Sequence, residues 1–129
     1  MAAFISAGCS GAAFSAASGP LRGEFAVVEV DGAAVDASLS ATVAFEDQGA
    51  VTGDAGCNRF GGSFKQDGGS ISIGPLMSSR RACEPVIMET ERKILASLQA
   101  SRSLAVSEDG VVLLSGDAPH RIRLQPLPR

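Results

Sequence analysis

The chain has 129 residues, of which 45% are apolar, and it contains fifteen Gly and six Phe but neither Trp nor Tyr. This length and composition fit one domain with a hydrophobic core, and they favour short strands with frequent turns over long helices. The formal net charge is −3 and the Lys and Arg residues are scattered. This argues against a nucleic-acid-binding protein, because phosphate recognition depends on clustered basic side chains.

The N-terminal segment carries the first of three cysteines. Small residues precede Cys9, and apolar residues stand before them from Phe4 on, a pattern similar to the end of a lipoprotein signal peptide that is cleaved after Gly8 and lipidated on Cys9. No basic residue stands upstream and the apolar stretch is short, so we expect a truncated signal. The alternative is an Ala/Ser-rich tail with an incidental cysteine. No stretch is long enough to span a bilayer.

The segment from Ser10 to Pro20 consists of Gly, Ala, Ser and Pro with a single Phe14. Such a segment buries too little apolar surface to offset the entropy cost of its own ordering. We therefore expect residues 1–20 to form the truncated lipoprotein signal and a flexible tether, and residues 21–129 to form the folded domain.

Several strands follow. Residues 25–30 are rich in β-formers and end at the turn signal Asp31-Gly32, and residues 39–45 alternate apolar and polar side chains, as a half-buried strand does. Residues 51–54 continue as a partner strand. The glycine-rich stretch 56–62 suggests bulges or positive φ angles. Residues 63–66 and 70–73 form a hairpin around Asp67-Gly68-Gly69.

One helix is predicted from about Glu84 to Ser101, with Pro85 in its first turn. Its apolar face is predicted to carry Ile87, Ile94, Leu95 and Leu98, which leaves Glu91, Arg92 and Lys93 largely for solvent. Strands at 104–106, 111–114 and 121–124 follow. The fold class is therefore α+β, mostly β: a curled antiparallel sheet or small β-barrel with one inserted amphipathic helix.

Cys57 and Cys83 could form a disulfide, bind a metal or act as a redox pair. A metal site needs about four ligands, whereas the chain offers one histidine and no CxxC grouping, which a redox pair also needs. The disulfide is favoured, and closing a loop of this length would stabilise the domain by roughly 3 kcal/mol.

The segment Gly56-Cys57-Asn58-Arg59-Phe60-Gly61-Gly62, the hairpin after it, and the segment from Ile73 to Cys83 resemble the core signature of the META domain (HslJ-like) family. The resemblance covers roughly residues 21–124. It implies a compact β-rich fold and an envelope or secreted location, and it implies no catalytic activity. Ser79-Arg80-Arg81 departs from the family, which often has Thr-Arg followed by an apolar residue.

A disulfide would bring the polar residues Asn58, Arg59 and Arg80 together. The functional hypothesis is a binding face, for example for an anionic group, because a guanidinium recognises such groups well. The alternative is that Asn58 caps a turn and that the arginines pair with local carboxylates. His120 is predicted to be a surface or turn histidine, and Met77 a filler of the core or its rim.

The expected function is that of a non-enzymatic, stress-related envelope protein that is lipid-anchored at Cys9, faces the periplasm, is monomeric, uses no metal or cofactor, and binds another envelope component. The alternatives are a secreted location, a small-ligand carrier or inhibitor, and an uncharacterised hydrolase. An apolar cavity would favour the carrier, a rim with Arg59 and Arg80 a protein partner, and convergent titratable groups in a cleft an enzyme.

Overall fold

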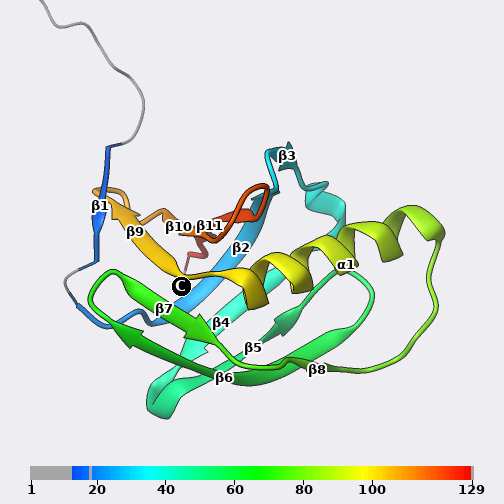
Figure 1. Cartoon of the computed structure of the whole chain (residues 1–129). Coiled ribbons are helices and arrows are strands. Elements are labelled where there is room, and N and C mark those ends of the chain that lie inside the picture. The colour runs from blue at the N-terminus through cyan, green and yellow to red at the C-terminus, as the bar shows by residue number, and fades with distance from the viewer. Residues whose placement is uncertain (1–12, 18, 129) are drawn as a thin grey trace, which may run out of the picture.

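The computed structural model describes residues 13–17 and 19–128. Eight antiparallel strands follow one another in the order β9–β10–β11–β2–β4–β5–β6–β7, and β7 pairs back onto β9 at Ser70 and Ser103, which closes a barrel (Figure 1). One helix is inserted between β8 and β9. The predicted fold class, a small β-barrel with one helix, is confirmed.

The elements have the following bounds. The barrel strands are β2 (Gly23–Val30), β4 (Thr42–Glu46), β5 (Ala50–Asp54), β6 (Arg59–Asp67), β7 (Ser70–Ile73), β9 (Ser103–Ser107), β10 (Val112–Ser115) and β11 (Arg121–Pro126). The short strands β1 (Phe14–Ala16), β3 (Ala33–Ala34) and β8 (Met77–Ser78) pair with β9, β2 and β6. The helix is α1 (Pro85–Ala100), and two 3-10 turns are η1 (Ala37–Leu39) and η2 (Asp47–Gly49).

The two ends of the barrel are covered differently. The helix α1 packs against β2, β7, β10 and β11 at one end. At the opposite end the β9–β10 turn, the start of β2 and the end of β11 meet, because neighbouring strands run antiparallel. Strand β1 lies on this second side of the molecule, beside β9 (Figure 1).

Alternating side chains fill the barrel. Val43, Phe45 and Val51 are buried from β4 and β5, and α1 adds the fully buried Ile94 and Leu98. Each such side chain stabilises the fold by about 1.5–3 kcal/mol through removal of its apolar surface from water. The interior of the barrel is therefore a packed hydrophobic core.

The helix differs from its prediction at one position. Arg92 and Lys93 are exposed, as expected, but Glu91 is only 6% exposed. Glu91 lies one turn before Ile94 on the buried face, over the loop that joins β5 to β6. That loop supplies polar partners, so a carboxylate is accommodated where the amphipathic pattern placed solvent.

Two N-terminal predictions meet different outcomes. The flexible-tether prediction is wrong for Phe14–Ala16, which form β1 in register with Ser107–Ala105 of β9. The guanidinium carbon of Arg123 lies 5.4 Å from the Phe14 ring centroid, which adds a cation–π contact. Cys9 lies outside the described residues, so its predicted lipidation stays a prediction. No helix among the described residues is long and apolar enough to cross a membrane.

Glycine stands at positions of the segment 56–62 for two different structural reasons, a positive φ angle and close packing of the backbone. Gly56 has a φ of +114°, as predicted. Gly61 and Gly62 instead belong to the regular ladder of β6 with β5, so the predicted bulge is wrong there. A Cβ at Gly62 would lie 2.9 Å from the Pro75 carbonyl oxygen, so glycine allows the returning chain to approach closely.

Candidate functional site

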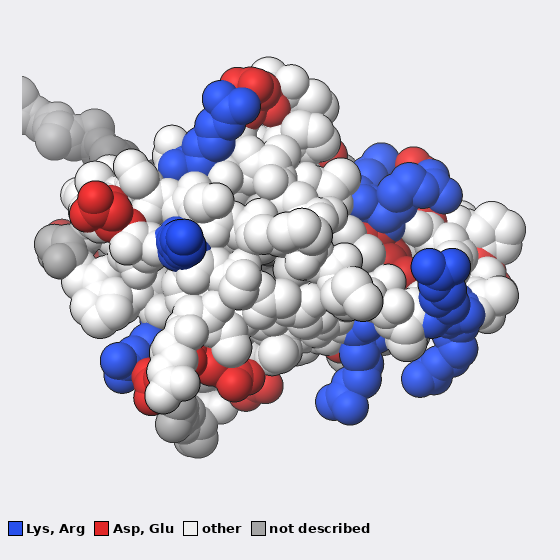
Figure 2. Space-filling view, turned by 60° about the horizontal axis from the view of Figure 1, so that its bottom comes forward, with Lys and Arg blue, Asp and Glu red and all other residues white. Residues whose placement is uncertain are grey.

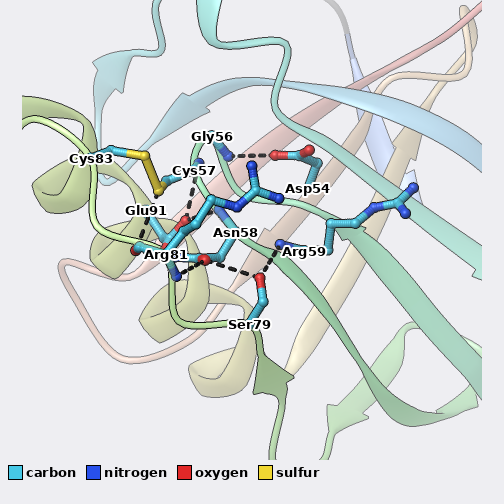
Figure 3. The surroundings of a disulfide bond; sticks show 9 residues. All are labelled: Asp54, Gly56, Cys57, Asn58, Arg59, Ser79, Arg81, Cys83 and Glu91. Carbon is cyan, nitrogen blue, oxygen red and sulfur yellow. Dashed lines mark hydrogen bonds between the residues drawn. A yellow bond between two sulfur atoms is a disulfide. The ribbon is translucent and has the colours of Figure 1, made fainter.

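The two cysteine-bearing loops meet beside the start of α1. Cys57 and Cys83 form a disulfide with their Cα atoms 6.1 Å apart, which confirms the predicted pairing (Figure 3). The bridge joins the β5–β6 loop to the segment between β8 and α1, 26 residues further along the chain. Both loops are also joined by hydrogen bonds that do not depend on the sulfur atoms.

Asn58 is the centre of these hydrogen bonds. Its Oδ1 accepts from the Arg81 N–H at 2.6 Å and from the Ser79 Oγ at 2.9 Å. Its Nδ2 donates to the Arg81 carbonyl oxygen at 3.2 Å and to Glu91 Oε2 at 2.8 Å. The amide thus uses its full donor and acceptor capacity inside the protein. With 2% exposure it is not available to a partner, so its predicted place on the binding face is corrected: it fixes the loops.

Glu91 holds the other side of the β5–β6 loop (Figure 3). Its Oε1 accepts from the Cys57 N–H at 3.1 Å and from the Asn58 N–H at 2.7 Å. Together with the Asn58 side chain, three donors therefore converge on one buried carboxylate. Because buried polar groups are costly unless paired, Glu91 and this loop stabilise each other.

Exposed side chains follow one another along the segment that this scaffold fixes. Arg59, Arg80 and Arg81 are exposed, and the side chains of Arg59 and Arg81 leave the loops in different directions (Figure 3). Met77 and Val86, each 77% exposed, stand on the same segment between β8 and the first turn of α1, and they are the two large exposed hydrophobic side chains of the described residues. We call these five residues the loop face. Lys and Arg side chains gather at this end of the molecule (Figure 2).

The arginines of the loop face have no ion-pair partner within 4.0 Å among the described residues, whereas Arg22, Arg92, Arg102 and Arg123 do. Asp54 is the cross-strand neighbour of Arg59, but its Oδ1 accepts from the Gly56 N–H at 2.9 Å. The predicted alternative of local ion pairs is therefore not found for Arg59 and Arg80. Arg59 also lines a shallow hollow with the carboxylates Glu24 and Asp54, which offset its charge.

Sequence reasoning missed three members of this region. Met77 was expected in the core or its rim, but β8 is an edge strand of two residues and leaves it in solvent. Val86 has no partner because it points away from the barrel in the first helical turn. The signal for Glu91 was its spacing: Ile87, Glu91, Ile94 and Leu98 repeat at intervals of four, three and four, which puts them on one helix face.

A second polar cluster brings three residues together beside a surface hollow of about 450 Å³. Ser97 Oγ lies 2.5 Å from Asp31 Oδ1 and 3.1 Å from His120 Nδ1, and His120 Nδ1 lies 3.7 Å from Asp31 Oδ1. Serine activation requires the histidine between the hydroxyl and the carboxylate. Here the hydroxyl lies between the other two groups and Ser97 is 1% exposed, so the arrangement does not activate a nucleophile and instead ties α1 to the neighbouring turns.

Among the described residues no group of three or more His, Cys, Asp or Glu side chains could hold a metal ion. The loop scaffold and the Ser97 cluster are both engaged in internal hydrogen bonds.

Comparisons with known proteins agree with this architecture. A family model described as META domain matches residues 19–127. Curated proteins gave no match. The NMR structure of a protein from Burkholderia xenovorans is 21% identical with a TM-score of 0.70, over 84% of this chain and 83% of that chain. The crystal structure of a DUF4847 family protein from Bacteroides vulgatus is 13% identical with a TM-score of 0.63, over 84% and 94%. These two structures share the fold, and the family match confirms the resemblance read from the cysteine segments.

Proposed function

Because the chain belongs to the META domain family, we propose that it is a non-enzymatic binding module of the bacterial cell envelope, and that the loop face binds another envelope component. The partner is a protein surface that offers an acidic group to Arg80 and Arg81 and an apolar patch to Met77 and Val86. Arg and Met are enriched in protein interfaces, whereas Lys and Glu are depleted.

One observation carries this proposal: the two large exposed hydrophobic side chains of the described residues and two arginines without ion pairs share the segment 77–86. A flexible segment would pay an ordering cost on binding, of about 0.5–1.5 kcal/mol for each immobilised long side chain. The disulfide and the Asn58–Glu91 hydrogen bonds fix the backbone on both sides of this segment beforehand. The loop face is thus presented in one backbone conformation.

The envelope location and the lipid anchor on Cys9 belong to the same proposal. The Cys57–Cys83 disulfide supports an oxidising compartment such as the periplasm. Four residues separate Cys9 from Phe14, where β1 begins. At about 3.3–3.6 Å per extended residue, these four residues span less than about 20 Å, so a lipid on Cys9 would hold the barrel close to the membrane. A role in stress, as the resemblance to heat-inducible lipoproteins implies, completes the proposal.

The binding proposal is tested by capture from detergent-solubilised envelopes, with the wild-type chain and three variants as bait. R80A/R81A and Met77→Ser/Val86→Ser each change one component of the loop face. R102A/R121A removes the same charge elsewhere on the surface and is the matched control. We expect one partner that the wild type and the control retain, and that both loop-face variants lose. Equal retention by all four proteins would contradict the proposal.

The location is tested separately by the intact mass of the natively expressed protein from the membrane fraction, before and after reduction with thiol alkylation. We expect a chain that begins at a lipid-bearing Cys9 and in which only reduction exposes Cys57 and Cys83. A soluble, unmodified chain with free thiols would contradict both the anchor and the envelope location.

A further inference from the structure

The chain from Met77 to Ala82 runs as an extended edge beside β6. All six residues are exposed, and no turn or bend interrupts them. The Ser79 N–H donates to the Arg59 carbonyl oxygen at 3.0 Å. In an antiparallel pair, residues that turn their backbone N–H and C=O toward the partner strand alternate with residues that turn them away. Ser79 therefore faces β6, whereas Ser78 presents its backbone groups outward.

The side chain of Asn58 continues this ladder past the end of β8 (Figure 3). Its Oδ1 accepts from the Arg81 N–H at 2.6 Å, and its Nδ2 donates to the Arg81 carbonyl oxygen at 3.2 Å. These are the two bonds that a residue of a paired strand exchanges with its neighbour. Met77, Ser79 and Arg81 are thus bonded along the same edge at intervals of two, which keeps the backbone extended as in a strand.

The opposite edge of this segment has no strand beside it in the part of the chain that the structure describes. There β8 pairs with β6 alone, and no hydrogen bond engages the backbone N–H of Arg80 or Ala82. The alternation places the outward N–H and C=O groups at Ser78, Arg80 and Ala82. A row of unpaired backbone groups on an exposed edge is a template for the addition of another strand.

The charges at this edge select the kind of chain that can pair with it. Arg80 and Arg81 are successive residues of an extended segment, so their side chains leave opposite faces of the sheet. Among the described residues neither has an ion-pair partner within 4.0 Å, whereas Arg22 and Arg92 do. A carboxylate on each face of an added strand can therefore pair with one of the two arginines.

A second copy of this chain fits the edge poorly. Two such segments paired edge to edge would bring the arginines of both copies onto one short ladder, where like charges destabilise a strand pair. We propose that the outer edge of residues 78–82 binds an extended segment of a different protein as an added β-strand, with two successive acidic residues of that segment beside Arg80 and Arg81. This inference rests on the proposed function, because it specifies how the loop face recognises its partner.

The first test uses the isotope-labelled full chain and a synthetic peptide of about eight residues, made of threonine and valine with two successive glutamates at its centre. We expect saturable binding, and at saturation the solvent exchange of the Ser78, Arg80 and Ala82 amides should slow at least about tenfold. Exchange of the Ser79 and Arg81 amides, which already have acceptors, should stay unchanged. No saturable binding, or slower exchange at Ser79 and Arg81 instead, would overturn the proposal.

The selection for acidic residues is tested with a matched peptide in which two glutamines replace the glutamates. It should bind about tenfold more weakly, the effect of two exposed ion pairs. R80A/R81A should bind both peptides with the same affinity. An equal affinity of the wild type for the two peptides would contradict the acidic partner.

A further test removes an outward N–H from the protein without changing its charge. Ala82→Pro and Ser78→Pro each delete one backbone donor, and proline is tolerated on an edge strand where its nitrogen faces solvent. Ala82→Val keeps the donor and is the matched control. Each proline variant should bind the glutamate peptide at least about fivefold more weakly, while the amide spectrum of α1 stays native and the control binds as the wild type does. Retained affinity in either folded proline variant would overturn strand addition.

The same variants separate this inference from the proposed function. In capture from envelopes, a partner that R80A/R81A loses but that the folded proline variants retain would contradict strand addition and leave the loop face as the binding site. A partner that R80A/R81A and the proline variants all retain would contradict the loop face itself.

Discussion

At the scale of single residues, Glu91 determines how the loop face is held. It is a buried carboxylate that accepts three hydrogen bonds from Cys57 and Asn58, and no described basic side chain pairs with it. Its contribution therefore comes from satisfying donors that would otherwise be buried without partners.

Glu91→Ala should lower the free energy of unfolding by about 3–5 kcal/mol, because it leaves three buried donors without an acceptor and creates a cavity. Glu89→Ala is the control on the same helix, since Glu89 is exposed and forms a surface ion pair with Arg92. That change should cost less than about 0.5 kcal/mol. Urea unfolding of both oxidised variants measures the difference. Equal losses would show that the Glu91 hydrogen bonds contribute nothing specific.

The sequence was informative about some of these residues and silent about others. The cysteine pair followed from the lack of metal and redox motifs, and the arginines from their places next to it. Asn58 and Glu91 were misplaced because their environment comes from segments 33 residues apart in the chain. The local pattern predicts that a glutamate between Thr90 and Arg92 faces solvent. Glu91 is buried instead because the β5–β6 loop packs against it.

At the scale of elements, tight contacts between strands explain why glycine stands at certain positions. A Cβ at Gly53 of β5 would lie 2.2 Å from the Thr42 carbonyl oxygen and 2.6 Å from the Phe60 ring. At Gly61 of β6 the nearest atom would be 3.6 Å away, an ordinary contact. Two glycines on neighbouring strands thus differ sharply in the space around them.

Gly53→Ala should therefore destabilise the protein by about 2–3 kcal/mol or more, because a core strand must shift to relieve the overlap. Gly61→Ala should change stability by less than about 1 kcal/mol. Thermal unfolding of the two variants tests this contrast. A Gly53→Ala variant as stable as Gly61→Ala would show that β4, β5 and β6 are less closely packed than described.

Gln66 of β6 holds the backbone just before β2 through hydrogen bonds to Gly19 and Leu21. Gln66→Ala removes both of its hydrogen bonds to Gly19 and Leu21 and should speed hydrogen exchange of the Leu21 amide at least about tenfold, since a net contribution of about 1–1.5 kcal/mol is lost. Lys65→Ala, on the exposed neighbouring residue, is the control and should leave that amide unchanged. Similar exchange in wild type and Gln66→Ala would mean that other contacts hold the segment.

The elements themselves were partly predictable. The turn at Asp31-Gly32 has positive φ at both residues, 52° and 87°, the hairpin geometry that this dipeptide favours. Strand β1 was missed because its pairing partner, Ser107, lies far along the chain, and the residues Phe14–Ala16 carry no strand pattern of their own. Pairing over such distances is decided by the closed barrel, which a local pattern does not describe.

At the scale of the whole molecule, the barrel separates two surfaces. The loop face lies beside the helix start, whereas β1 lies at the opposite end of the barrel, beside the end of β9. A lipid on Cys9 would place the β1 end toward the membrane and leave the loop face directed away from it. This orientation would give a soluble or membrane-bound partner access to Arg80 and Arg81.

The disulfide contributes to the stability of the whole domain. Loss of the bridge in Cys57→Ala/Cys83→Ala should lower the free energy of unfolding by about 3–4 kcal/mol, because the denatured chain regains the freedom of a loop with a sequence separation of 26. The Asn58–Glu91 hydrogen bonds remain, so the variant should still fold. Urea unfolding provides the value, and a loss below about 1 kcal/mol would contradict the loop-closure account.

The binding role of the loop face is tested most directly by site-specific photo-crosslinking in living cells. A photoreactive residue replaces Ala82, which is exposed between Arg81 and Cys83, and in a second strain it replaces the exposed Ala34 of β3. We predict a discrete crosslinked product from position 82 that disappears with R80A/R81A, and none from position 34. No product at position 82, or the same product from both positions, would contradict the claim that this protein acts through its loop face.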